Sequence, residues 1–258
     1  MILKKSPAEI ERMASAGAIL VKTMNLLAGK IRPGVSTREL DRAAERYIRS
    51  QGAEPAFKGY RGFPGSICVS PNSMIVHGIP GPYKLARGDV LSVDVGVIAD
   101  GWVADAARTF AVGPISPIAH KLLATTEQAL LLAVEQCRGG NRLGDVSHAV
   151  QVHVEAAGLS IVRSLVGHGI GRSMHEDPQV PNYGKPGTGV TLEPGMVLAV
   201  EPMVTAGRQA VRVAEDRWAI YSQDGSLAAH FEFTIAITAD GPRILTPWHE
   251  AGDGRAVA

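Results

Sequence analysis

The chain has 258 residues, of which 45% are hydrophobic and 20% charged, a composition typical of a globular protein with a sizeable core. Its 26 basic and 25 acidic residues give a net charge of +1, which argues against a strongly basic nucleic-acid-binding protein. The sequence has no apolar run long enough to span a membrane and no signal-like apolar core at its start, and two cysteines cannot form a disulfide framework. These features predict a cytoplasmic enzyme or binding protein.

Helix-capping residues and apolar spacing predict the helical segments. Ser6 with Glu9 and Ser36 with Glu39 are capping boxes, and Ser116 before Pro117 is a further helix start. The predicted helices run from Ser6 to before the break at Arg32-Pro33-Gly34, from Ser36 to about Ser50, from Ser116 to about Cys137, and from about Leu143 to Ala157, where Gly158 ends the helix.

Apolar and β-branched segments predict strands between and after these helices. The predicted strands cover residues 90–98, 102–112, 160–166, 196–202, 212–221 and 228–238, whereas residues 177–195 are predicted to be irregular and the end from Gly252 to be frayed. Asp100-Gly101 is a strong two-residue hairpin signal. With that turn Asp105 lies opposite Gly96, so Asp94 and Asp105 should point to the same face of the sheet as a diagonal pair.

An internal repeat runs through this pattern. The form L-x-x-G-x-V-L-x-V-[D/E] covers residues 85–94 and recurs at residues 192–201, an offset of 107 (201 − 94). Arg32-Pro-Gly is echoed by Arg138-Gly-Gly, and His77-Gly-Ile by His168-Gly-Ile, although one strand entry of this kind can resemble another by coincidence. The repeat predicts a single domain over residues 1–258 with duplicated halves at about 6–112 and 116–246. Each half would supply a helix pair and part of the sheet, with the site in the cleft between them.

Carboxylates recur inside apolar strands. Asp94 and Glu201 close the two copies of the repeat, Asp105 is the partner of Asp94, and Glu232 lies in a further apolar strand. A buried carboxylate must be paired, hydrogen-bonded, protonated or bound to metal, and a single strand aspartate is more often a structural hydrogen bonder. Two divalent cations would cancel the four charges together. His168, between glycines, is the candidate imidazole, and oxygen ligands with one imidazole suit Mn, Fe, Co or Zn.

At these residues the sequence resembles the type I methionine aminopeptidases, which have the α+β pita-bread fold. The resemblance covers about residues 10–246, and its motifs are Asn72–Pro80, Asp94-Val-Gly96, Asp105 with Arg108-Thr-Phe110, Gly167–Gly171, His175–Pro178, Glu201-Pro202 and Phe231-Glu232. The resemblance implies a pseudo-two-fold antiparallel sheet covered by two helix pairs, with the active site in the central cleft. It also implies that Asp94, Asp105, His168, Glu201 and Glu232 bind two divalent metal ions, with Asp105 and Glu232 bridging.

The resemblance further implies the chemistry of the site. Metal-activated water would attack the first peptide carbonyl, Glu201 would shuttle a proton, His175 would stabilise the tetrahedral intermediate and His77 would contact the substrate backbone. The expected methionine pocket consists of Tyr60, Phe63, Cys68 and Trp218, with Phe57 and Met174 beside them. Phe57, Arg61, Phe63, Met174 and Phe233 depart from the commonest family pattern. His120, His148, His153, His230 and His249 carry no motif and are predicted to be surface or packing residues.

The expected substrates are N-terminal methionine peptides and nascent chains with a small, uncharged second residue. The resemblance favours a monomer, and the balanced charge and the lack of a long apolar run predict no direct nucleic-acid or membrane contact. Docking near the ribosomal exit would suit an enzyme that acts on nascent chains, although the near-neutral charge gives it no support. A pita-bread enzyme that cleaves X-Pro bonds or dipeptides is disfavoured because such enzymes usually carry a large N-terminal domain. The type II methionine aminopeptidases are also disfavoured, because they carry an insertion before the residue matching Glu201. A binding module that lost catalysis would have lost ligands, and no H-E-x-x-H zincin motif occurs.

Overall fold

The capping residues define the helices of the computed structural model, which describes residues 1–250. The helices are α1 (Pro7–Ala28), α2 (Thr37–Ser50), α3 (Pro117–Gln136) and α4 (Leu143–Ala156). Both predicted capping boxes form: the Ser6 and Ser36 amides each donate to a carboxylate oxygen three residues later, at 2.8 Å. None of the helices in this part of the chain has both the length and the apolar character of a membrane-spanning segment.

Short strands make up the sheets between the helix pairs. The first half contains β1 (Glu54–Pro55), a 3₁₀ turn η1 (Tyr60–Gly62), β2 (Cys68–Pro71), β3 (Met74–Val76), β4 (Val90–Ala99) and β5 (Trp102–Ala111). The second half contains β6 (Ser160–Ile161), β7 (Gly167–Gly169), β8 (Glu176–Val180), β9 (Val197–Val200), β10 (Met203–Thr205), β11 (Val211–Val213), β12 (Ile220–Ser222), β13 (Ala228–His230), β14 (Phe233–Thr238) and β15 (Gly241–Ile244).

The longest strands form the predicted β4–β5 hairpin. Asp100 and Gly101 occupy its turn with φ of 50° and 74°, the left-handed conformation that this turn requires. Gly96 pairs with Asp105 in the antiparallel register, so the predicted pairing is confirmed. Because alternate residues share a face, Asp94 and Asp105 lie on the same side of this hairpin.

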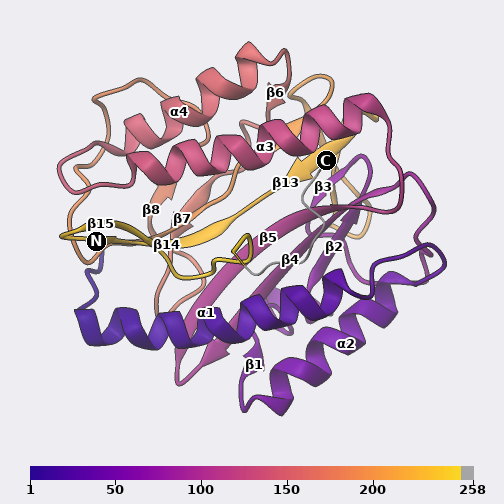
Figure 1. Ribbon diagram of the computed structural model, residues 1–258, viewed down its shortest axis with the longest axis horizontal. Helices are drawn as coiled ribbons and strands as arrows, with labels where there is room; N and C mark the ends of the chain where they lie inside the picture. The colour runs from indigo at the N-terminus through magenta and orange to yellow at the C-terminus, as the bar shows by residue number, and fades with distance from the viewer. Residues whose placement is uncertain (251–258) are drawn as a thin grey trace.

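The helices cover the sheets from one side. Helix α1 packs on β4 and β5, whereas α3 packs on α4 and on β10 and β13. Figure 1 shows the α1–α2 pair and the α3–α4 pair lying side by side over the strands. One sheet has the order β1–β4–β2 with β5 beside β4, and another the order β15–β14–β9–β7–β8. Strand β5 contacts β14, so the two sheets meet where the predicted carboxylates lie.

The two halves of the chain repeat the same backbone contacts. Ser36 bridges to Lys84 near the start of α2, and Arg142 bridges to Thr191 near the start of α4, at offsets of 106 (142 − 36) and 107 (191 − 84). The Gly34 amide donates to the Leu85 carbonyl at 2.7 Å, and residues 140 and 192 make the matching bond at 2.9 Å. These contacts tie each helix pair to the segment that precedes a site strand.

Several predicted segments differ from the structure. The predicted irregular segment 177–195 overlaps β8, which pairs with β7. The predicted strand 212–221 is instead the β11–β12 hairpin, and 160–166 shortens to β6. The predicted strand 228–238 is interrupted at Phe231 and Glu232, where the chain passes from β13 to β14. The predicted fraying from Gly252 lies outside the described residues.

Candidate metal centre and its cavity

The predicted site residues converge on one cavity of about 170 Å³. Its lining combines carboxylates, histidines and aromatic side chains: Phe57, Tyr60, Arg61, Phe63, Cys68, His77, Asp94, Asp105, His168, His175, Glu201, Trp218 and Glu232. Every residue predicted for the site lies in this wall except Met174. The Met174 Cε atom lies next to Gly96, where an edge of the Phe57 ring also lies.

Hydrogen bonds between β5 and β14 hold the carboxylates in place. The Thr234 hydroxyl donates to the Asp105 carbonyl at 2.7 Å and accepts from the Asp105 amide at 3.0 Å. The Glu232 amide donates to the Ala107 carbonyl at 2.9 Å. These bonds fix the backbone of Asp105 and Glu232 across the junction of the two sheets, so their side chains face the same space.

Two glycines allow β7 to carry His168 between two neighbouring strands. A Cβ atom on Gly167 would lie 2.3 Å from the Ala199 carbonyl oxygen, and one on Gly169 would lie 2.1 Å from the Asp177 carbonyl oxygen. Any larger residue would therefore force β8 or β9 away. The close packing brings the His168 ring to the carboxylates of the opposite sheet.

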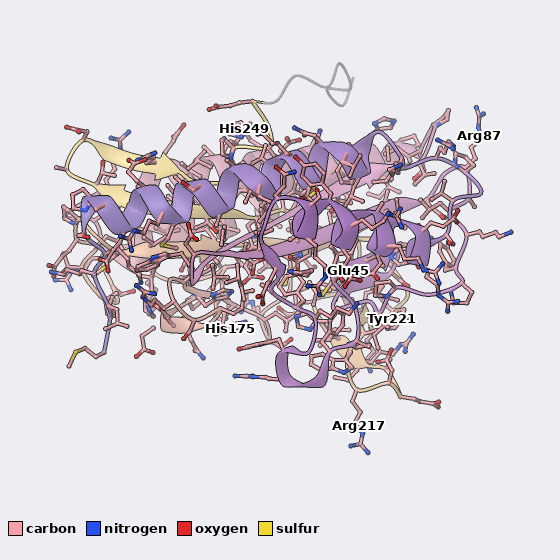
Figure 2. The ribbon with its side chains drawn as sticks, turned by 90° about the horizontal axis from the view of Figure 1, so that it is seen from below. Glu45, Arg87, His175, Arg217, Tyr221 and His249 are labelled. Carbon is pink, nitrogen blue, oxygen red and sulfur yellow. The ribbon has the colours of Figure 1, made fainter. Side chains whose placement is uncertain are left out.

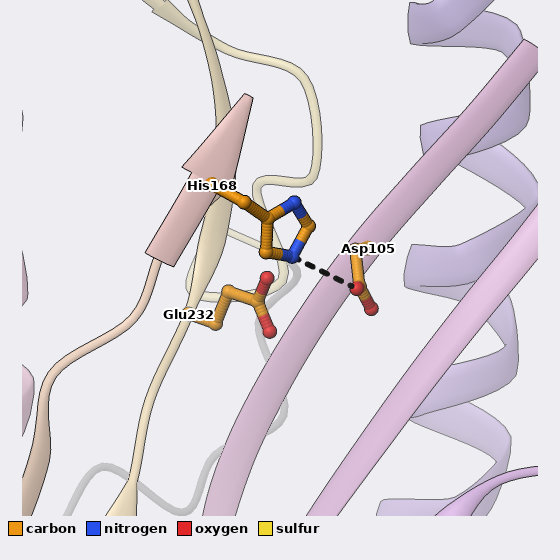
Figure 3. A group of neighbouring side chains, drawn as sticks. All are labelled: Asp105, His168 and Glu232. Carbon is orange, nitrogen blue, oxygen red and sulfur yellow. Dashed lines mark ion pairs between the residues drawn. The ribbon is translucent and has the colours of Figure 1, made fainter. Parts of the chain in front are cut away.

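The His168 ring directs its Nε2 atom toward the carboxylates. Nε2 lies 4.0 Å from Asp105 Oδ2 and 3.7 Å from Glu201 Oε1, and Figure 3 shows the ring of His168 facing Asp105 with Glu232 beside them. Nδ1 lies 2.9 Å from the Gly169 carbonyl oxygen. A carbonyl can only accept, so Nδ1 carries the hydrogen and the Nε2 lone pair faces the acidic groups, as in metal-binding histidines.

Burial keeps the site largely uncharged when no cation is present. Burial raises the pKa of Asp105 to about 8, helped by the nearby Glu201 carboxylate, and raises the pKa of Glu201 to about 8. The pKa values of Asp94 and Glu232 rise well above their usual range because both groups are buried beside other carboxylates. Burial also lowers the pKa of His168 to about 4, so its contacts with the carboxylates are those of a neutral imidazole.

The buried polar atoms of the site fit a bound cation. Within residues 1–250, Asp94 Oδ1, Asp105 Oδ1 and Glu232 Oε1 are buried without a hydrogen-bond partner. One ligand atom each of Asp105, His168 and Glu232 lies within 4.8 Å of the others, a spacing suited to a shared ion. Orphaned buried oxygens are costly, and divalent cations would satisfy them. The donor set is that of an oxygen-rich site with imidazole.

One histidine of this site was not predicted. His230 was expected to be a surface or packing residue, and it is buried, as a packing residue would be, with Nε2 at 3.3 Å from Glu201 Oε2. Its place beside Glu201, two residues before Glu232, was not predicted. That spacing is the sequence signal that could have identified it.

His175 lies at the open side of the cavity and is positioned by Tyr60. The Tyr60 hydroxyl lies 2.8 Å from His175 Nδ1, and the two rings stack with centroids 5.5 Å apart. Burial and the Arg61 guanidinium lower the pKa of His175. When the hydroxyl donates to Nδ1, the neutral ring carries its hydrogen on Nε2. Figure 2 shows His175 on the side of the molecule away from the helices.

Aromatic rings and a cysteine form the apolar part of the cavity wall. The rings of Phe63 and Trp218 meet edge to face with centroids 5.1 Å apart. Cys68 pairs with Asp94 across β2 and β4, and burial raises the pKa of its thiol well above the usual value. The thiol therefore stays protonated and contributes a soft, polarisable surface beside the aromatic rings.

His77 enters the cavity from a loop with unusual backbone geometry. Its φ of 61° lies in the left-handed region, which non-glycine residues adopt at a cost. Burial lowers its pKa to about 4, so the ring is neutral at physiological pH. A neutral, strained histidine at a cavity wall is typical of a residue held for contact with a ligand.

A buried ion pair anchors the loop between β7 and β8, which carries His175. Lys5 Nζ lies 2.6 Å from Glu176 Oε2, and both side chains are less than a tenth exposed. Lys5 Nζ also donates to the Leu3 carbonyl, while Glu176 accepts from the Ser173 amide at 3.2 Å. The first residues of the chain are therefore joined directly to the loop at the cavity mouth.

Comparisons with known proteins find relatives along nearly the whole chain. The model of metallopeptidase family M24 matches residues 11–239. A methionine aminopeptidase of Clostridium perfringens is 52% identical over 246 residues, covering 95% of this chain and 99% of that protein. Methionine aminopeptidase 1 of Bacillus subtilis is 50% identical over 246 residues with the same coverage.

Solved structures that share the fold include a methionine aminopeptidase and a prolidase. A methionine aminopeptidase from Thermotoga maritima superposes with a TM-score of 0.94 at 44% identity, covering 95% of this chain and 99% of the other. A prolidase from Pyrococcus furiosus superposes with a TM-score of 0.77 at 24% identity, covering 94% of this chain and 65% of its own length. At that identity the prolidase shares the fold alone.

Proposed function

The chain belongs to metallopeptidase family M24, and from this premise we propose that it removes the N-terminal methionine from peptides and nascent proteins. It has the α+β pita-bread fold of the family, and it is a hydrolase of the aminopeptidase class. The observation that carries the proposal is the cavity in which four carboxylates and His168 adjoin an aromatic, sulfur-containing wall. An exopeptidase for methionine needs both parts.

The proposed cofactor is a pair of divalent ions among Co, Mn, Fe and Zn. Their proposed ligands are the carboxylates and imidazole of the cavity, namely Asp94, Asp105, His168, Glu201 and Glu232. When bound, such ions lower the pKa of water and polarise the peptide carbonyl for hydrolysis. The buried oxygens without hydrogen-bond partners among the described residues support this assignment.

Glu201 is the proposed proton carrier of the reaction. Its side chain is 13% exposed, whereas that of Glu232 is 2% exposed, so Glu201 faces the space that substrate would enter. A carboxylate that borders this space can accept a proton from one reacting group and return it to another. Glu201 would take the proton of the attacking water and deliver it to the leaving amine.

His175 is the proposed donor to the developing oxyanion. Since the Tyr60 hydroxyl can donate to Nδ1, the Nε2 hydrogen of His175 is available for the substrate oxygen. His77, which also lines the cavity and has a strained backbone, would contact the substrate backbone.

Replacing His175 with alanine is expected to lower kcat by about 10²- to 10³-fold, because one oxyanion donor is lost. The metal content, measured by elemental analysis of the purified variant, should stay at the wild-type value. Tyr60→Phe is the matched control, because it keeps the imidazole and removes the hydroxyl that orients it, so a smaller loss is expected. Loss of metal in His175→Ala would instead identify His175 as a ligand.

The proposed substrate preference follows from the cavity. Phe57, Phe63 and Trp218 would enclose an unbranched thioether side chain, with the Cys68 thiol at its side. Arg61 at the mouth adds a positive charge near the second residue of a bound peptide, which disfavours lysine there. We propose that the second residue is small and uncharged, with Arg61 accounting for the exclusion of a basic one.

Peptide cleavage by protein that has been stripped of metal and then reloaded tests the function. With Co, Mn, Fe or Zn added back singly, methionine should be released from Met-Ala-Ser far faster than from Met-Lys-Ser, and Ala-Ala-Ser should remain intact. Mass spectrometry of the products measures all three. Release of alanine from Ala-Ala-Ser would make the enzyme a general aminopeptidase, and no cleavage despite stoichiometric metal would favour a binding module.

The proposed organisation is one catalytic domain over residues 1–258 with duplicated halves at about 6–112 and 116–246. The matching bridges of Ser36 with Lys84 and of Arg142 with Thr191 support the duplication. A monomer acting in the cytoplasm on nascent chains, with docking near the ribosome, agrees with this substrate. The net charge of +1 gives no support to direct nucleic-acid binding.

A further inference from the structure

The described residues offer a second cluster of ligand atoms beside the one that contains His168. One atom each of Glu201, His230 and Glu232 lies within 4.8 Å of the others. His230 Nε2 lies 3.3 Å from Glu201 Oε2 and 3.9 Å from Glu232 Oε2. Ligand atoms held about 2.0–2.2 Å from one ion at tetrahedral angles are about 3.4 Å apart, so the three side chains are close to the spacing that a shared ion needs.

The imidazole of His230 makes no hydrogen bond with any of the described residues. Its side chain is 2% exposed, and both ring nitrogens are buried without a hydrogen-bond partner there. The contact with Glu201 is close but is not aligned as a hydrogen bond. An imidazole buried in this way is costly unless its lone pair is bound.

The backbone of His230 is fixed on both sides. Its amide donates to the Thr109 hydroxyl at 2.9 Å, and that hydroxyl donates back to its carbonyl at 2.9 Å. Met203 pairs with it on the other side across β10 and β13. The ring is therefore presented to Glu201 from a rigid position, as a first-sphere ligand requires.

We propose that His230 is a metal ligand, with Nε2 binding the same divalent ion as Glu201 and Glu232. This inference rests on the proposed function and adds a sixth protein ligand to the centre. Glu201 then lies between two imidazoles, since its Oε1 faces His168 and its Oε2 faces His230. A second nitrogen ligand favours Zn, Co or Fe over Mn, which prefers oxygen ligands.

Heteronuclear NMR of the full chain tests the ligand directly. The metal-stripped protein, with isotope-labelled histidine, is loaded with two equivalents of spin-active cadmium. A one-bond coupling between cadmium and nitrogen is expected at Nε2 of both His168 and His230. Coupling at His168 without coupling at His230 would overturn the proposal and leave the proposed function intact. Cadmium bound without coupling at either histidine would contradict both.

Metal titration supplies the second readout. By calorimetry, His230→Gln should weaken one of the two Co²⁺-binding events by about 10-fold or more, with a smaller change for Mn²⁺. His120→Gln, on the first turn of α3, is the matched control and should bind both ions as the wild type does. Glutamine keeps a hydrogen-bond donor but is a poor ligand, so wild-type affinity in His230→Gln would overturn the proposal. The wild-type NMR measurement remains decisive if the variant fails to fold.

Discussion

Replacing Asp105 with asparagine is expected to abolish peptide cleavage and, in the absence of metal, to make the protein more stable. Asp105 is a proposed bridging ligand, and losing the ions that it holds removes several kcal/mol of transition-state stabilisation, at least about 10³-fold in rate. In the metal-free protein the same carboxyl is buried beside Glu201, which raises its pKa to about 8. Near neutral pH, folding without metal therefore requires this carboxyl to take up a proton, and asparagine avoids that cost.

Three measurements on the same variant check this expectation. Cleavage of Met-Ala-Ser gives the rate, elemental analysis gives the bound metal, and urea unfolding in chelator gives the free energy of unfolding. Asp240→Asn, an exposed residue of the β14–β15 turn, is the control and should match the wild type in all three. Wild-type activity in Asp105→Asn would contradict the dinuclear centre. Lower stability in chelator would show that the carboxylates do not repel one another.

The metal-free protein is expected to lose several kcal/mol of stability as the pH rises from about 6.5 to about 8. Asp105 and Glu201 have ordinary pKa values of 3.8 and 4.5 but titrate at about 8 when folded. The folded state therefore holds more protons than the unfolded chain in this range, and the free energy of unfolding falls with pH. Compensation by the histidines fades over this range, because the histidines of the unfolded chain lose their protons around their ordinary pKa of 6.5.

Below pH 6.5 the histidines and the buried carboxyls have opposite effects on the free energy of unfolding. His168 and His77 titrate at about 4 and His230 at about 3 when folded, so the unfolded chain takes up more histidine protons as the pH falls below 6.5. The histidines thus favour folding as the pH rises toward 6.5, while the carboxyls disfavour it. Because Asp94 and Glu232 also take up protons more readily when folded, the histidines offset the carboxyls only in part, and the stability without metal should change less steeply with pH below 6.5 than above it.

Urea unfolding between pH 5 and pH 8, in chelator and with Co²⁺, measures this dependence. Bound metal competes with protons for the same atoms, so the loaded protein should gain stability over the range in which the free protein loses it. The slope above pH 6.5 should be shallower in Asp105→Asn. A metal-free slope of the opposite sign would mean that the carboxyls are ionised in the folded protein.

Local sequence signals predicted the elements that carry most of the site. The capping boxes located α1 and α2, and Asp100-Gly101 gave the register that places Asp94 and Asp105 on one face. Such signals are strong because a cap or a two-residue turn depends on few residues close in sequence. Strands β6 and β10 have two or three residues, too few for any periodicity to appear.

The missed parts depend on contacts between distant residues. Strand β8 includes Pro178 and polar residues, and it pairs with β7 because the glycines beside His168 allow close approach. His230 carries no motif of its own and acquires its surroundings from Glu201, which a different strand supplies. The positions of the pocket residues also depended on the fold, since Phe57 lines the cavity whereas Met174, which also lies next to Gly96, does not.

The bond pair between Thr234 and Asp105 has a consequence for how the protein is made. It joins residues 129 positions apart, and the buried pair of Lys5 and Glu176 joins residues 171 positions apart. Because the ribosome delivers the chain from its amino end, β5 emerges long before the strand that completes its edge. The centre therefore cannot assemble until synthesis has passed residue 234, so an interrupted translation product would be inert, without the capacity to act on its own amino terminus.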